Sequence, residues 1–300
     1  MTTVDRPIPL LRPRPHRTTD LWQGLAFNRL TTVFERATEV PFDDASRIVF
    51  FSDSHRGDGS RVDAFTPNEP LFLHALHRYF REGFTYIEVG DGDELWQNGS
   101  FSAIRRAHRE VFDLLHQFET QGRLHLILGN HDLHSGRSRR VEKDGLVAIE
   151  GLILRHVNTA QRIFVTHGHQ ADAKSDYFHW ISRWAVHHVW RRVQWLGLFR
   201  NPRIGRGKSK ESIEQRIIAW VQDQRQAIIC GHTHRPIAAP FDSTPYFNTG
   251  CCIVPHLLTG LEIQNGEITL VKWRMAPDGS PQSARRTLLT QPQPLRRFRF

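Results

Sequence analysis

Five short polar blocks in this chain of 300 residues carry side chains of the types that bind divalent metal ions. Their carboxylates, amide oxygen and imidazoles suit ions such as Mn²⁺, Fe²⁺ or Zn²⁺. Because the blocks contain no thiolate ligands, a structural zinc site is not indicated. Seven candidate ligands exceed what one tetrahedral ion needs and fit two ions that share a carboxylate. The candidates are Asp53, His55, Asp91, Asn130, His167, His232 and His234.

Each polar block follows a short apolar run that is typical of a buried β-strand. Between the runs, residues 69–81 and 101–118 show the three- and four-residue spacing of helices. This alternation predicts a layered α/β domain. In open α/β sheets, ligands bind beyond the carboxyl ends of the strands, and all five blocks fall at that position. The apolar runs are 47–51, 85–89, 124–128, 162–165 and 227–230.

As an ordered set, the blocks resemble the calcineurin-like metallophosphoesterase family, whose pattern is D-x-H, GD-x-x-D, GNH-[DE], H and GH-x-H. One position departs from it, because Glu94 stands where the family has Asp, so the carboxylate is one methylene longer. The blocks in this chain are Asp53-Ser54-His55, Gly90-Asp91-Gly92-Asp93-Glu94, Gly129-Asn130-His131-Asp132, Thr166-His167-Gly168-His169 and Gly231-His232-Thr233-His234.

The resemblance implies an α/β sandwich of two mixed β-sheets flanked by helices, with a helical insertion between the fourth and fifth blocks. It also implies two divalent ions per chain, with Mn²⁺ expected and Fe²⁺ or Zn²⁺ as alternatives. One ion would be bound by Asp53, His55, Asp91 and His234. The other would be bound by Asp91, Asn130, His167 and His232, so that Asp91 bridges the two.

The reaction that the resemblance implies is hydrolysis of a phosphate ester or pyrophosphate bond by a hydroxide held between the two ions. Asp91 would be catalytic through both ions. His131 would stabilise or protonate the leaving oxygen, or else orient its neighbours, with Glu94 as its expected partner. The candidate substrate contacts in these blocks are Asn130 and Arg56; the alternative for Arg56 is an ordinary surface arginine.

Two details resemble the UDP-2,3-diacylglucosamine hydrolase branch of the family. The second block continues to Trp96, and a long interval separates the fourth and fifth blocks. In that branch the interval forms a lid over acyl chains. Here residues 176–200 combine an apolar stripe with four tryptophans among arginines. This pattern predicts a lid or membrane-facing helix that contacts substrate through Trp184. The alternative is an amphipathic helix packed on the core. Ser54 and His169 depart from the branch pattern.

The net charge is +9, and much of the excess is arginine near the two ends of the sequence. Residues 1–19 and 276–300 are therefore predicted to be basic tails, usually disordered at this composition. They would flank a phosphoesterase domain at 20–275 with its lid at about 173–225. With neither a signal-peptide pattern nor an apolar run near the ~20 residues of a membrane span, the sequence predicts a cytoplasmic protein that could bind an anionic inner-membrane face.

The expected substrate is a phosphorylated small molecule or lipid, and two alternatives share the metal chemistry. A phosphodiesterase or nuclease would use the positive charge to bind nucleic acid, but the basic residues gather in the tails and the Trp-rich segment rather than in a nucleic-acid motif. A Ser/Thr protein phosphatase-like enzyme normally has Arg-Gly after the second block, where this chain has Leu95-Trp96.

Overall fold

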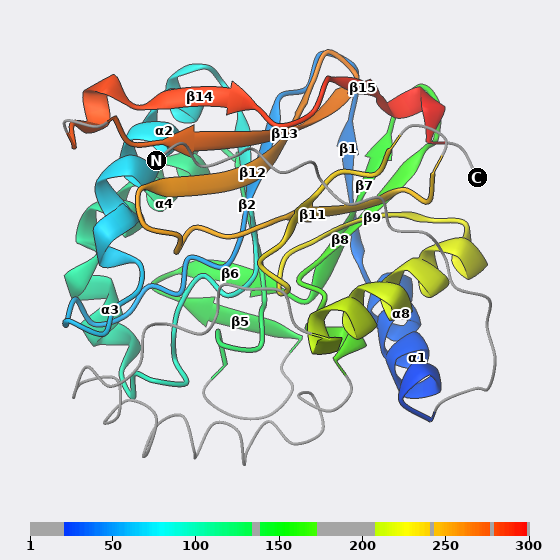
Figure 1. The fold of residues 1–300 in the computed structure, drawn as a ribbon, viewed down its shortest axis with the longest axis horizontal. Coiled ribbons are helices and arrows are strands. Elements are labelled where there is room, and N and C mark those ends of the chain that lie inside the picture. Colours follow the sequence, from blue (N-terminus) through cyan, green and yellow to red (C-terminus); the bar gives the residue numbers. More distant parts are fainter. Residues whose placement is uncertain (1–20, 134–138, 173–207, 241–242, 277–278, 299–300) are drawn as a thin grey trace.

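In a computed structural model of the chain, the described residues are 21–133, 139–172, 208–240, 243–276 and 279–298. Within these ranges, two β-sheets pack face to face, and helices cover their outer faces (Figure 1). This confirms the predicted α/β sandwich of two mixed sheets.

The larger sheet consists of β2 (Ile48–Phe51), β3 (Thr85–Val89), β4 (Leu124–Ile127), β5 (Arg140–Lys143), β6 (Leu146–Ile149), β12 (Leu257–Gln264), β13 (Glu267–Arg274), β14 (Arg285–Leu288) and β15 (Gln293–Pro294). Its order is β14-β13-β12-β2-β3-β4-β6-β5, with β15 also paired to β13. The strands from β2 to β6 in this order are parallel, and antiparallel pairs extend the sheet on both sides. The carboxyl ends of β2, β3 and β4 therefore share one edge.

The smaller sheet consists of β1 (Thr38–Phe42), β7 (Gly151–His156), β8 (Arg162–Thr166), β9 (Ala227–Cys230), β10 (Pro236–Ile237) and β11 (Tyr246–Thr249). Its order is β1-β7-β8-β9-β11-β10. Because β8 and β9 are parallel, their carboxyl ends also share one edge.

The helices are α1 (Leu21–Glu35), α2 (Glu69–Arg81), α3 (Phe101–Ala107), α4 (Arg109–Thr120) and α8 (Lys208–Gln224), with short 3-10 turns η1 (Thr66–Asn68), η2 (His169–Ala171), η4 (Pro281–Ser283) and η5 (Leu295–Arg297). None of these described helices is long and apolar enough to cross a membrane. The predicted helix at 101–118 is divided at His108, whose backbone leaves the helical region (φ −112°, ψ 39°). Its ring lies 2.8 Å from Asp63 Oδ2 and 3.1 Å from Glu69 Oε2, and these contacts stabilise the break.

Successive residues of β2 show how the layers pack. Val49 and Phe51 pack beneath the helices α2 and α4, whereas Ile48 and Phe50 face the space between the sheets. A strand covered on both faces needs a continuous apolar run, as seen here. A third cluster, which includes Trp220 of α8, fills the space between the smaller sheet and the pair α1 and α8.

The C-terminal segment differs from the predicted basic tail. Strands β14 and β15 pair with β13, and Leu295 and Phe298 are buried in the core between the sheets. The charged side chains of β14 do not prevent pairing, because an edge strand pairs through its backbone. Arg285 is exposed, and Arg286 Nε donates to Glu262 Oε1 at 2.7 Å. The described residues after 278 are therefore part of the domain.

The predicted lid lies largely outside the described residues, as do Trp184 and the N-terminal tail. The described part, α8, packs on the domain rather than standing away from it. Ile217, Trp220 and Val221 are buried against α1 and the smaller sheet, and the indole Nε1 of Trp220 donates to Thr31 Oγ1 at 3.0 Å. Helix α8 thus belongs to the core because its apolar stripe meets a partner helix and a sheet.

Candidate metal centre

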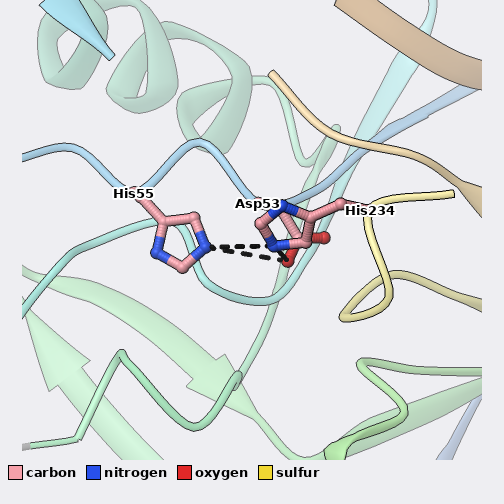
Figure 2. Close-up of side chains that lie close together, drawn as sticks. All are labelled: Asp53, His55 and His234. Carbon is pink, nitrogen blue, oxygen red and sulfur yellow. Dashed lines mark hydrogen bonds and ion pairs between the residues drawn. The ribbon is translucent and has the colours of Figure 1, made fainter. Parts of the chain in front are cut away.

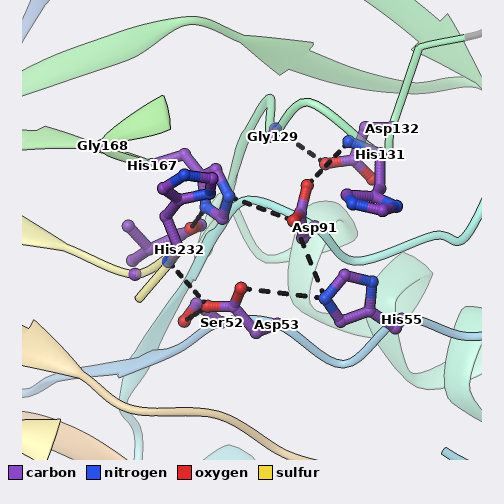
Figure 3. Close-up of polar contacts among 12 residues, drawn as sticks. Ser52, Asp53, His55, Asp91, Gly129, His131, Asp132, His167, Gly168 and His232 are labelled. Atoms are coloured by element: carbon purple, nitrogen blue, oxygen red, sulfur yellow. Dashed lines mark hydrogen bonds and ion pairs between the residues drawn. The ribbon is translucent and has the colours of Figure 1, made fainter. Parts of the chain in front are cut away.

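The seven predicted ligands lie in loops at the carboxyl ends of five strands. Three of these strands, β2, β3 and β4, belong to the larger sheet, and β8 and β9 belong to the smaller one. The loops meet where the two sheets present the same edge, so residues far apart in sequence become neighbours (Figure 3). In strand order the residues are Asp53, His55, Asp91, Asn130, His167, His232 and His234.

One group of potential ligands consists of Asp53, His55 and His234 (Figure 2). His234 Nε2 lies 3.0 Å from Asp53 Oδ1, and His55 Nε2 lies 3.8 Å from the same oxygen. The two Nε2 atoms are 3.4 Å apart. Ligand atoms of all three residues lie within 4.8 Å of one another, so a single cation could contact all of them.

A second group consists of Asp91, His167 and His232. His167 Nε2 lies 3.2 Å from Asp91 Oδ2. The same carboxylate oxygen lies 3.7 Å from His55 Nε2 in the first group. Asp91 therefore faces both groups, which is the position that a bridging ligand requires.

A third close group contains His55, Glu94 and His131, and hydrogen bonding accounts for it. Glu94 Oε2 lies 2.9 Å from His55 Nδ1, and Glu94 Oε1 lies 2.8 Å from His131 Nδ1. With Nδ1–H of His55 donated to this carboxylate, its Nε2 is left to face Asp53 and Asp91. A carboxylate behind a ligating histidine fixes the ring and its tautomer, so Glu94 orients both histidines.

The backbone at the ligand residues is strained. Five of them adopt the left-handed region, which favours glycine and costs on the order of 1–3 kcal/mol at other residues. Such strain persists where surrounding contacts hold it, and it concentrates at functional sites. The five residues and their φ angles are Asp53 (53°), His55 (47°), Asp91 (51°), His232 (66°) and His234 (56°).

Close packing behind the ligands fixes their directions. His167 Nδ1 lies 2.8 Å from the carbonyl oxygen of Val89, so this nitrogen donates to the backbone and Nε2 is directed at Asp91. A Cβ at Gly129 would lie 2.1 Å from Asp91 Oδ1 and 2.2 Å from the Asp91 amide nitrogen. Only glycine permits the third block to approach the bridging carboxylate this closely.

The charges at the site favour cations. Burial opposes ionisation of Asp91, but His167 and His131 outweigh it and hold the pKa of this carboxyl well below its usual value. Burial lowers the pKa of His167, but Asp91 and Asp53 outweigh it and raise the pKa to about 9. The ionised carboxylates therefore need positive charge close by. A bound metal ion would supply that charge and displace protons from the ligands.

Unsatisfied buried atoms give an independent test of the metal assignment. Asp53 Oδ1, Asn130 Oδ1 and His167 Nε2 are buried and make no hydrogen bond. Buried polar atoms are rarely left in this state, and all three belong to the predicted ligand set. Their chemistry, carboxylate, amide oxygen and imidazole, suits borderline divalent ions. The residues therefore fit two divalent metal ions.

His131 lies at the rim of the two groups, with 14% of its side chain exposed. Its amide nitrogen donates to Asp91 Oδ1 at 2.8 Å, and its ring stacks on Trp96 with centroids 4.2 Å apart and planes 29° apart. The bond to Asp91 thus fixes the backbone, while Glu94 and Trp96 hold the ring. The sequence marks Trp96 only as a motif position, and spacing alone does not indicate its contact with His131.

The prediction that Arg56 contacts a phosphate is wrong, and so is its alternative as a surface arginine. Only 2% of the residue is exposed. Both terminal nitrogens donate to Glu88 at 2.7 Å, and Nε donates to Asp93 Oδ1 at 2.9 Å. These bonds use three of the five guanidinium donors, and burial of the side chain keeps the other two away from a substrate. The other predicted substrate contact, Trp184, lies outside the described residues.

A buried ion network lies beneath the site, and the sequence does not predict it. Lys143 Nζ lies 2.6 Å from Asp93 Oδ2 and 3.2 Å from Asp132 Oδ1. Asp132 also accepts from the amide nitrogens of Asp93 at 2.9 Å and Gly129 at 2.8 Å, so it ties the second block to the third. The last position of GNHD is the only sequence signal for this network, and nothing marks Lys143.

The fold and the paired ligand groups define a phosphoesterase-type metal site. The sequence matches the model of the calcineurin-like phosphoesterase family over residues 46–236, so the chain belongs to that family. It is therefore a hydrolase of the phosphoesterase class, whose members typically bind divalent metals. A search of curated protein sequences found no significant match.

Several solved structures have a similar fold. Vacuolar protein sorting 29 from Cryptosporidium parvum is 12% identical, with 83% of this chain and 98% of that chain covered and a TM-score of 0.42. Its counterpart from Chaetomium thermophilum is 11% identical, with 83% and 100% covered and a TM-score of 0.43. A 5'-nucleotidase precursor from Thermus thermophilus is 12% identical, with 82% and 54% covered and a TM-score of 0.25. Likeness at this level carries no argument about substrate.

Proposed function

We propose that this chain hydrolyses a phosphate ester or phosphoanhydride with two divalent metal ions bound side by side. The observation that carries the proposal is the place of Asp91, whose Oδ2 lies 3.2 Å from His167 Nε2 and 3.7 Å from His55 Nε2. Asp53, His55 and His234 would hold one ion with Asp91. Asn130, His167 and His232 would hold the other with Asp91.

When bound, two such ions supply Lewis acidity, which makes water a stronger nucleophile at neutral pH and neutralises phosphoryl oxygens. Mn²⁺ is the ion we propose, because the mixed oxygen and imidazole set suits it. The protein contributes position: the strained loops fix the ligands, and Glu94 and Val89 fix the imidazole tautomers of His55 and His167.

His131 is the residue we assign to the leaving group. Glu94 accepts from its Nδ1, so the proton for the leaving oxygen would be held at Nε2. Trp96 stacks on the ring and prevents it from turning away.

For the substrate we propose a phosphorylated small molecule, with a UDP-2,3-diacylglucosamine-like lipid as the specific case to test. The sequence supports this case through the Trp96 position and through the tryptophans of residues 176–200, which lie outside the described part of the chain. A substrate of this kind would bring the protein to the cytoplasmic face of a membrane.

The test begins with metal-free protein reconstituted with Mn²⁺. We expect about two ions per chain, and Asp91→Asn should lower both the stoichiometry and the activity. His131→Asn should keep its metal and lose ~10²–10⁴-fold in kcat, with a smaller loss for p-nitrophenyl phosphate, whose leaving group scarcely needs a proton. His116→Asn, at an exposed histidine on α4, is the control.

A substrate panel then separates the classes: a phosphomonoester, bis(p-nitrophenyl) phosphate, a UDP-linked diacylated lipid and single-stranded DNA. Cleavage of the lipid pyrophosphate bond well above the other rates would support the specific case. Preferred cleavage of DNA would replace it with a nuclease. Full activity without bound metal would overturn the dinuclear proposal itself.

A further inference from the structure

A groove with a cavity volume of about 590 Å³ lies at the opposite end of the smaller sheet from the metal centre. It includes Arg162, the first residue of β8, and Ala227, the first residue of β9. The metal ligands His167 and His232 follow the last residues of the same two strands. At ~3.3 Å per residue, the two sites are roughly 15 Å apart along β8.

The groove has a fixed wall made by the C-terminal segment. Gln161 Nε2 donates to the carbonyl oxygens of Leu295 at 2.8 Å and Phe298 at 3.1 Å. Figure 1 shows the result, with η5 beside the turn that connects β7 and β8. On the other side, Gln226 Nε2 donates to the carbonyl oxygen of Arg162 at 2.6 Å. Hydrogen bonds between segments distant in sequence therefore hold the groove in shape.

Three exposed arginines from three different segments line this groove: Arg162, Arg225 and Arg296. The described residues that line it include no Asp or Glu. Arg162 Nη2 lies 3.4 Å from Oε1 of Glu39, a residue outside the groove. The Arg162 guanidinium also lies over the ring of Phe34, 5.0 Å from its centroid. These contacts hold Arg162 in position.

Arg225 stands just past the last residue of α8 with a φ of 48°. Glycine is the usual residue at such a helix end, because the left-handed conformation is unfavourable for other side chains. The chain turns here, and Arg225 lies beside Arg162 and Arg296 at the groove. Three like charges that surround one concave space are stabilised when an anion enters it.

We propose that this groove is a second binding site, separate from the metal centre, for a phosphate-bearing small molecule. Guanidinium groups bind phosphate through paired, charge-assisted hydrogen bonds. The volume lies within the ~300–1,000 Å³ of small-molecule sites. A membrane surface would instead contact protruding basic and aromatic residues, and this site is concave.

The experiment uses full-length, Mn²⁺-loaded protein and methylenediphosphonate, a diphosphate mimic whose P–C–P bridge phosphoesterases do not cleave. Calorimetry should resolve two classes of site, one at the metals and one at the groove. Arg225→Gln and Arg296→Gln should each raise the Kd of the groove site by about 10-fold and leave catalysis unchanged. Asp91→Asn should weaken binding only at the metal site.

Arg109→Gln serves as the matched control, because Arg109 is 79% exposed on α4, away from the groove. Ligand should slow hydrogen exchange in residues 157–162 and 225–228 of the wild type but not of the Arg225 variant. If the groove binds nucleotides, a nucleoside methylenediphosphonate should bind more tightly than methylenediphosphonate itself; equal binding indicates a site for free diphosphate. The proposal is overturned if both groove variants bind methylenediphosphonate as tightly as wild type, or if Arg109→Gln weakens this binding equally. It is also overturned if the groove variants lose only their binding to phosphatidylglycerol vesicles.

Discussion

Glu94 offers the sharpest test of how the second block works. Its two carboxylate oxygens accept from different histidines, His55 Nδ1 at 2.9 Å and His131 Nδ1 at 2.8 Å. In Glu94→Gln, the side-chain oxygen can still accept from one ring. The amide NH₂ then faces the other Nδ1–H, and two donors repel. One histidine must turn or change tautomer, which aims the wrong nitrogen at the metal or the substrate.

The expected magnitude follows from the bond that is lost. A hydrogen bond to a charged group contributes about 1.5–3 kcal/mol. If Glu94→Gln removes one of the two, kcat/KM should fall by about 10- to 100-fold. Glu94→Asp keeps the charge but loses one methylene of reach. It should therefore hold one histidine well and recover only part of the activity.

The assay compares kcat/KM of the Mn²⁺-loaded variants on p-nitrophenyl phosphate, with metal content and melting temperature measured on the same samples. Glu142→Gln, at an exposed carboxylate on β5, is the matched control. Unchanged activity in Glu94→Gln at full metal content would refute the orienting role. A loss matched by an equal fall in melting temperature would show that Glu94 supports the fold instead.

Two further predictions concern the supporting structure. Gly129→Ala places a Cβ 2.1 Å from Asp91 Oδ1, so metal stoichiometry and activity should both fall. Gly24→Ala in α1, with no atom within 4 Å of the new Cβ, is the control and should leave both intact. Normal Mn²⁺ binding by Gly129→Ala would contradict the close approach. Burial lowers the pKa of His108, but Asp63 and Glu69 outweigh it and raise the pKa to about 9. Because the unfolded pKa is ~6.5, this stabilisation is fully present below that pH and is lost as pH rises through about 9, on the order of 3 kcal/mol. Urea unfolding of wild type and His108→Gln between pH 6 and 10 should converge with rising pH, and parallel curves would disprove the assignment.

The sequence by itself determined the sheet strands and the loops that follow them. A run such as Ile48–Phe51 is apolar at every position because the strand is buried on both faces, and this signal is local. The polar residues after such runs must then gather at the carboxyl edge. The sequence therefore suffices to place Asp53, Asp91 and Asn130 at that edge, since parallel neighbours end together.

Only the tertiary structure decided which partners the side chains meet. Arg56 follows a ligand block directly, yet it turns inward to Glu88, 32 residues away. Glu94 spans to His55, 39 residues away, and arginines near the C-terminus join the sheet rather than a tail. Periodicity reports which face of an element is buried, but it carries no information on which distant segment covers that face. Strand register and the order in which the chain crosses the sheets settle those contacts. They therefore decide whether an arginine such as Arg56 forms a buried ion pair or contacts a substrate.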